Sequence, residues 1–167
     1  MKRNIEIKAR ASNYTLLADR IKTIADSGPV VILQKDTFFN CQNGRLKLRE
    51  LSPSEGQLIF YQRADQAGPK ESSYVIVGTT EPDALRQSLS LALGVCGFVE
   101  KRRLLFMVGN TRIHLDEVYG LGNFLEIEVV LADDETVDAG RAIARDLMLA
   151  LGISEENLIE GAYVDLL

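Results

Sequence analysis

The segment NIEIKAR, residues 4–10, places charged side chains at alternate positions. Because side chains alternate between the two faces of a β-strand, Glu6, Lys8 and Arg10 share one face with Asn4, and the apolar residues occupy the other face. Carboxylates and cations aligned in this way can bind an anion together with a metal ion, or can lie in solvent as an ordinary polar face. The segment therefore predicts a two-faced strand whose polar face could carry chemistry.

The same alternation recurs in RLKLR, EKRRL, RIHLD and FLEIEVV. The charged positions of these segments and their neighbours are Glu6, Lys8, Arg10, Arg45, Lys47, Arg49, Arg63, Lys70, Lys101, Arg103, Arg112, Asp116, Glu126 and Glu128. Ten cations and four carboxylates give this set a charge of +6. The whole chain carries −5, so all its other residues carry −11.

A cation-rich sheet face with a few carboxylates suits a polyanion that arrives with a metal ion. Arginine and lysine hold phosphate oxygens, and carboxylates are ligands of Mg²⁺ or Mn²⁺. An ordinary solvated face mixes charges of both signs to limit repulsion. Cross-strand ion pairs on a solvated face are the alternative, and the pattern alone leaves both interpretations open.

The elements that must position these residues are mostly strands joined by short turns. Strands are predicted at 4–10, 30–41, 45–51, 57–64, 70–78, 98–108, 111–118 and 124–131, with a short last strand at 162–167. Helices are predicted from Asn13 to about Ser27, where Gly28 and Pro29 end the helix, and over residues 82–94 and about 134–151. Turns at Asn43-Gly44 and Gly109-Asn110 require antiparallel neighbours. The fold class is therefore α+β, with a large antiparallel sheet of eight or nine strands that curls or closes.

Bulk composition bounds the class of protein. With 167 residues and 46% apolar residues, a single domain over 1–167 with a real core is expected. The net charge of −5 argues against nucleic acid as a partner, and no apolar run is long enough to span a membrane. The first ten residues lack an apolar signal-peptide core, which predicts a cytoplasmic protein. Cys41 and Cys96 are interpreted as small core residues.

Other chemistry-bearing residue types give weaker signals. His114 is the only histidine, so any histidine-based triad would have to be built around it; we interpret it as a wall residue. The glycines of GLGN lack the preceding strand and following helix of a dinucleotide site. Phe38 and Phe39 are interpreted as core and barrel-mouth residues.

Several of these segments together resemble the CYTH superfamily, which groups class IV adenylate cyclases with thiamine triphosphatases and inorganic triphosphatases. The resemblance rests on NIEIKAR, DTFFN…GRLKLRE, KRRLLF and TRIHLDEVYGLGNFLEIEVVL, and it is closest to the class IV cyclase-like branch. It implies an antiparallel eight-stranded β-barrel tunnel, open at both ends, with helices outside and charged faces inside. It therefore favours the tunnel interpretation over the solvated face.

The resemblance also implies roles for individual residues. Glu6 and Lys8 match the end of the family's glutamate-x-glutamate-x-lysine signature and are the expected catalytic residues. Glu126 and Glu128 match an acidic pair on a late strand that binds metal together with Glu6, and Asp116 matches an acidic residue that binds metal directly or through water. The expected triphosphate-binding residues are Lys8, Arg10, Lys47, Arg49, Arg63, Lys101, Arg103 and Arg112. The expected cofactor is Mg²⁺ or Mn²⁺.

One residue departs from the signature. Asn4 stands where the family has a glutamate, so one metal position loses its charge. Three functions are therefore considered: hydrolysis of a triphosphate, class IV cyclase chemistry on ATP, and non-catalytic binding of polyphosphate or nucleotide. No adenine pocket is identified from the residues, and a homodimer is left open.

Overall fold

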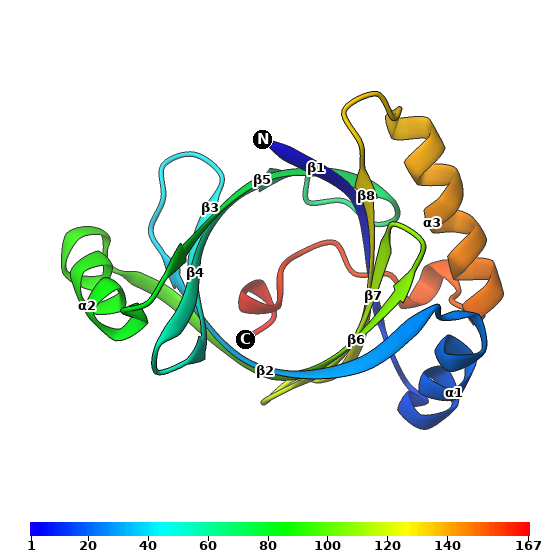
Figure 1. The fold of residues 1–167 in the computed structure, drawn as a ribbon, viewed down its shortest axis with the longest axis horizontal. Coiled ribbons are helices and arrows are strands. Elements are labelled where there is room, and N and C mark those ends of the chain that lie inside the picture. The colour runs from blue at the N-terminus through cyan, green and yellow to red at the C-terminus, as the bar shows by residue number, and fades with distance from the viewer.

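The computed structural model describes all residues 1–167. Eight antiparallel strands close into a barrel in the order β1-β5-β4-β3-β2-β6-β7-β8 (Figure 1). The strands are β1 (Lys2–Arg10), β2 (Ser27–Phe39), β3 (Arg45–Ser52), β4 (Glu55–Arg63), β5 (Lys70–Thr79), β6 (Val95–Val108), β7 (Thr111–Val118) and β8 (Gly122–Leu131). The helices α1 (Tyr14–Ile24), α2 (Pro82–Leu93) and α3 (Val137–Leu151) lie outside the ring. The predicted fold class is confirmed.

The helices α1 and α3 cover the side of the barrel formed by β1, β8 and β7. The outward faces of these strands supply Ile5, Ile7 and Ile127, which are at most 2% exposed, to a core of 18 buried residues. A local capping signal sets the start of α1, as the sequence predicts. The Asn13 side chain accepts a hydrogen bond from the backbone N–H of Leu16 at 3.1 Å and so caps α1.

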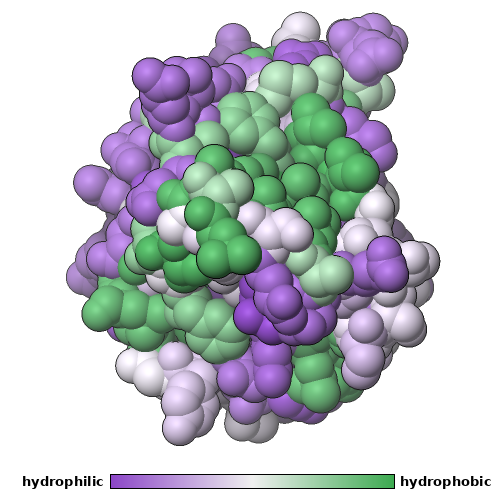
Figure 2. Space-filling model, turned by 90° about the vertical axis from the view of Figure 1, so that its left-hand side faces the viewer, coloured by the Kyte–Doolittle hydropathy of each residue, from purple (hydrophilic) through white to green (hydrophobic).

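The opposite side of the barrel is covered less completely. Helix α2 packs against β2, β3 and β4, yet Pro82 is its only buried residue. Hydrophobic side chains gather on this face in Figure 2, and Leu91 on α2 is 90% exposed. None of the helices has the length and apolar character needed to cross a membrane.

Three local predictions are wrong. The first helix ends at Ile24, and Gly28 and Pro29 lie inside β2, where the pairing with β6 shifts between Ser27 and Val30. An irregular stretch of this kind tolerates proline because the missing N–H removes no regular ladder bond. Cys41 and Cys96 are exposed instead of buried. They follow strand β2 and begin strand β6 at one end of the barrel, where little packs over them.

The third wrong prediction concerns the end of the chain. Residues 162–167 form no strand; instead Tyr163–Asp165 make a short 3-10 helix. This segment lies across one end of the barrel, which the resemblance implied to be open (Figure 1). The Tyr163 ring is 4% exposed and packs 4.9 Å from the Phe124 ring, centroid to centroid, while Asp165 is bonded to Arg45 at 2.8 Å. A buried tyrosine and an ion pair thus fix the tail without a sheet ladder.

Candidate active site

The barrel encloses a cavity of about 330 Å³. Ten of the fourteen charged residues of the alternating set line it: Glu6, Lys8, Lys47, Arg49, Arg63, Lys101, Arg103, Arg112, Glu126 and Glu128. The inward arrangement follows from strand alternation combined with closure of the sheet, because one face of every strand then points at the axis.

One wall of the cavity is rich in carboxylates. Register pairs Glu6 with Glu128 and Lys8 with Glu126 across β1 and β8. Each carboxylate has a cationic partner: Glu126 lies 3.2 Å from the ammonium of Lys8 and 2.5 Å from the guanidinium of Arg103. Glu128 lies 3.0 Å from Arg112, and Glu6 is paired with Arg63. We name Glu6, Glu126, Glu128 and His114 of β7 the acidic wall.

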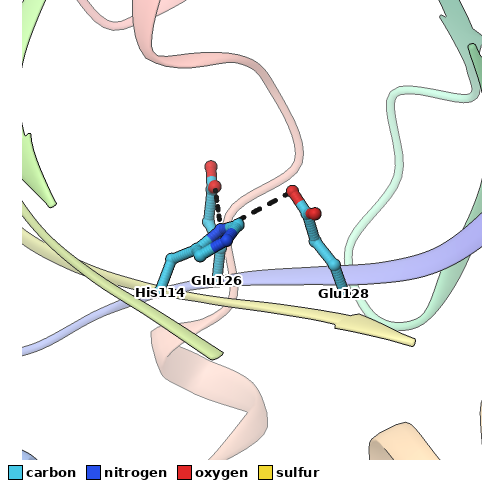
Figure 3. A group of neighbouring side chains, drawn as sticks. All are labelled: His114, Glu126 and Glu128. Carbon is cyan, nitrogen blue, oxygen red and sulfur yellow. Dashed lines mark ion pairs between the residues drawn. The ribbon is translucent and has the colours of Figure 1, made fainter. Parts of the chain in front are cut away.

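His114 lies beside the carboxylates of the acidic wall. The sequence by itself indicates only a wall residue without a chemical role. Its Nδ1 lies 3.5 Å from Glu126 and 3.6 Å from Glu128 (Figure 3). These separations are too long for hydrogen bonds, and the buried Nδ1 has no hydrogen-bond partner. One ligand atom from each of the three residues lies within 4.8 Å of the others. Register was the missing signal, since β7 sets His114 opposite Glu126.

Burial and charge set the protonation of this wall. Burial alone would raise the pKa of Glu126, but the charges of Arg103 and Lys8 outweigh it and hold that pKa well below its usual value. Burial, reinforced by Arg103, lowers the pKa of His114. The group is therefore an ionised carboxylate beside a neutral imidazole, and both are forms that bind metal ions.

Asp116 does not line the cavity and is completely buried. Its carboxylate accepts hydrogen bonds from Arg103 at 2.7 and 2.6 Å and from the Tyr163 hydroxyl at 2.9 Å. Lys101 lies 3.4 Å away. Burial would raise the pKa of Asp116, but Arg103 and Lys101 lower it to about 2. The geometry gives Asp116 the position of a residue that orients Arg103, and its expected metal role stays a prediction.

The opposite wall, formed by β2 and β3, is rich in cations; we name Asp36, Lys47 and Arg49 the basic wall. Asp36 accepts bonds from Lys47 at 2.8 Å and from Arg49 at 2.9 and 3.1 Å. Burial lowers the pKa of Lys47 to about 7, although Asp36 opposes the shift. Sequence reasoning missed Asp36. Its alternation with Gln34 and Phe38 in LQKDTFF was a usable signal.

Three cations of the charged set lie away from the cavity lining. Arg10 is exposed, with its guanidinium 5.4 Å from the centre of the Phe124 ring, so its expected role in triphosphate binding stays a prediction. Lys70 is buried and donates to the backbone carbonyls of Gln66 and Glu160 at 2.8 and 2.6 Å. Arg45 binds the tail instead. The other predicted site residues, Asp116 apart, share the one cavity.

The arrangement has two chemical capacities. The lysines and arginines form a positively charged surface that matches a chain of phosphate oxygens. The donors of His114, Glu126 and Glu128 fit a divalent cation, because the orphaned Nδ1 faces two carboxylate oxygens at one point of the wall. Fold and site together define a closed antiparallel barrel with a cation-lined interior.

The chain belongs to the CYTH domain family, whose model matches residues 2–163. Adenylate cyclase CyaB of Aeromonas hydrophila is 24% identical over 171 residues, which span 95% of this chain and 85% of that protein. The PH1012 protein of Pyrococcus horikoshii OT3 has a similar structure, with a TM-score of 0.86 and 24% identity over 98% of this chain and 99% of that one. A Hippeastrum protein described as having a dominant triphosphatase activity has a TM-score of 0.65 and 16% identity over 97% and 91% of the two chains.

Proposed function

We propose that this protein is a metal-dependent enzyme that hydrolyses a phosphoanhydride bond of a triphosphate-containing substrate bound inside the barrel. The observation that carries the proposal is the opposition of two walls across one cavity, cationic on β2 and β3 and carboxylate-rich on β1, β7 and β8. Phosphoryl transfer depends mainly on positioning and on neutralising charge, and this cavity offers both.

Within this proposal the basic residues bind and align the substrate. Lys47 and Arg49 contact phosphate oxygens from one side, and Lys8, Arg63 and Arg103 contact them from the other. Asp36 and Asp116 hold the guanidinium groups of Arg49 and Arg103 in fixed orientations, because each accepts two bonds from its arginine. An arginine held in this way binds phosphate with little further loss of side-chain freedom.

Glu126 and Glu128 are the proposed metal ligands, with His114 as a third donor and Glu6 beside them in register. A bound Mg²⁺ or Mn²⁺ would neutralise phosphate charge and lower the pKa of a bound water. Arg103 and Lys8 hold the pKa of Glu126 well below its usual value, so this ligand needs no deprotonation before a cation binds.

A class IV cyclase acting on ATP is the second candidate. It is favoured by the likeness to the Aeromonas adenylate cyclase, whereas the Hippeastrum protein favours hydrolysis. In a cyclase the 3′-hydroxyl of ATP would attack the α-phosphorus and release pyrophosphate, with the same contacts to the triphosphate. A non-catalytic polyphosphate-binding module is the third candidate, because Asn4 removes one acidic residue from the wall.

One screen separates the three functions. Purified protein is incubated with tripolyphosphate, ATP or thiamine triphosphate in the presence of Mg²⁺ or Mn²⁺, and phosphate, pyrophosphate and cyclic AMP are quantified. Release of phosphate supports the hydrolase, and equal amounts of cyclic AMP and pyrophosphate identify the cyclase. Binding without turnover of any compound would overturn both enzymatic assignments, and a Glu126→Gln variant serves as the control for contaminating phosphatases.

A further inference from the structure

The C-terminal segment is tied to the barrel before it reaches the cavity. The backbone N–H of Ile159 donates to the carbonyl of Lys8 on β1 at 2.9 Å. The buried ammonium group of Lys70, at the start of β5, donates to the carbonyl of Glu160 at 2.6 Å. These contacts hold the segment against β1 and β5, and they deliver the buried side chain of Tyr163 to the end of the barrel, where it lines the cavity.

The aromatic ring of Tyr163 lies against two lysines of the cavity. The ammonium nitrogen of Lys8 is 3.8 Å from the ring centre, and that of Lys101 is 4.8 Å from it. Lys8 is held further by Glu126 at 3.2 Å and by the carbonyl of Gly161 at 3.4 Å. The electrons of a ring face attract cations, most strongly where water is excluded. A lysine fixed in this way loses less side-chain freedom when it binds a phosphate.

The hydroxyl of Tyr163 acts on a third cation through a carboxylate. It donates to Asp116 at 2.9 Å, and the same carboxylate accepts bonds from Arg103 at 2.7 and 2.6 Å. Asp116 is completely buried outside the cavity lining, whereas Arg103 lines the cavity. The hydroxyl therefore restrains the carboxylate that orients the guanidinium group. One side chain of the C-terminal segment thus reaches Lys8, Lys101 and Arg103.

We propose that Tyr163 is a positioning residue for three cations of the cavity. Its ring fixes the ammonium groups of Lys8 and Lys101. Its hydroxyl fixes Asp116 and thereby Arg103. The inference rests on the proposed function, in which these cations bind the triphosphate. The C-terminal segment then completes the cation arrangement as well as lying across one end of the barrel, and the two parts of the tyrosine side chain have separable effects.

The role of the ring is tested by the affinity for tripolyphosphate, measured by calorimetry in EDTA so that no turnover is needed. Tyr163→Met removes the ring but still fills the space with a flexible apolar side chain. We expect it to weaken binding about three- to thirtyfold, as loss of a buried cation–π contact does. Tyr163→Phe keeps the ring and should bind within about twofold of the wild type. Tyr119→Met, at a tyrosine that is 82% exposed, is the matched control and should change nothing.

The role of the hydroxyl is tested by steady-state kinetics with the triphosphate that the screen identifies as substrate. Tyr163→Phe should lower kcat about three- to tenfold and leave KM within about twofold, because Arg103 keeps its charge but loses part of its fixed orientation. Tyr163→Met should lower kcat and raise KM together. A residue that only packs the end of the barrel would show no such division between the phenylalanine and methionine variants.

The outcomes separate this proposal from the proposed function. Equal affinities of Tyr163→Met and wild type, or equal losses in Tyr163→Met and Tyr163→Phe, would overturn the positioning role of the ring and leave the triphosphate function intact. Wild-type protein that binds tripolyphosphate without turning over any triphosphate would overturn the enzymatic function, and the affinities would still decide the role of the ring. Wild-type protein that does not bind tripolyphosphate would overturn both. Thermal melts confirm folding, and Tyr163→Phe keeps the kinetic test decisive if Tyr163→Met does not fold.

Discussion

The two walls of the cavity pair their buried charges with different ratios of carboxylates to cations. On the basic wall one carboxylate, Asp36, serves both Lys47 and Arg49, so positive charge is left over. On the acidic wall Glu126 and Glu128 have cations of their own, and His114 adds a donor that is bonded to nothing. Buried charges must be paired, so the basic wall keeps one cation in excess, whereas the acidic wall keeps an unpartnered His114 nitrogen beside carboxylates that are already paired. We therefore expect the basic wall to bind an anion and the group around His114 to bind a cation.

The largest effect is expected from the residue on which the basic wall depends. Asp36→Asn preserves volume but leaves two buried cations without their carboxylate. We expect the free energy of unfolding to fall by about 3–5 kcal/mol, as for other broken buried ion pairs. Chemical denaturation measures this change. Tripolyphosphate should raise the melting temperature of the variant more than that of the wild type, because the ligand replaces the lost charge.

Asp65→Asn is the matched control for Asp36→Asn. It also removes a carboxylate that faces an arginine, but the Asp65 side chain is 56% exposed and 3.2 Å from Arg45. An exposed pair contributes about 0–1 kcal/mol, so this variant should be nearly as stable as the wild type. Equal losses in the two variants would show that Asp36 has no special place on the basic wall.

The acidic wall is tested by Glu126→Gln and Glu128→Gln. Each change removes one ligand charge and keeps the side-chain size, and we expect activity to fall about 100- to 1000-fold, the usual loss for one group that stabilises a transition state. High Mn²⁺ should restore part of it, which titration of the metal against initial rate would reveal. If both variants match the wild type in activity and metal affinity, the carboxylates are structural.

The pKa of Lys47 predicts a pH dependence for the basic wall. Burial lowers this pKa to about 7, so Lys47 is charged below pH 7 and loses its charge above it. Affinity for tripolyphosphate should therefore decrease by about tenfold between pH 6 and pH 9 because of this group, and binding at pH 8 should take up a proton. Calorimetry in two buffers with different ionisation enthalpies measures that uptake.

Lys47→Arg separates this effect from titration of the phosphates themselves, because arginine stays charged throughout the range. The variant should bind with a flatter pH profile and without the proton uptake. Identical profiles for the two proteins would mean that Lys47 keeps its proton in the unliganded protein and that burial does not control the charge of the basic wall.

The smallest and least direct effect is expected at Asn4. Asn4→Glu adds a carboxylate two residues from Glu6 on the same strand face, where it would repel Glu6 without metal and share a cation with it when metal is present. In EDTA we expect the free energy of unfolding to fall by about 1 kcal/mol, with a lower melting temperature. We expect Mn²⁺ to stabilise the variant more than it stabilises the wild type. An unchanged metal-dependent shift would place position 4 outside the metal site.

Short-range patterns in the sequence determined most of the fold. Alternation assigned Glu6, Lys8, Glu126 and Glu128 to one face, and the turn at Gly109-Asn110 joined β6 to β7 as predicted. The caps at Asn13 and Gly152 marked helix ends correctly. These features are local, because period, turn chemistry and capping depend on residues a few positions apart.

The tertiary structure alone decided which charges meet. Strand register brought His114 to Glu126 and Glu128 across β7 and β8, and it set Asp36 opposite Arg49 and beside Lys47 across β2 and β3. Tertiary packing also buried Asp116 behind Arg103 and carried Tyr163, far along the chain, into the end of the barrel. Alternation states the face of a residue but not its level along the barrel axis. That level depends on the relative shift of strands distant in sequence, so the sequence supplied the charged side chains and only the closed barrel sorted them into two walls.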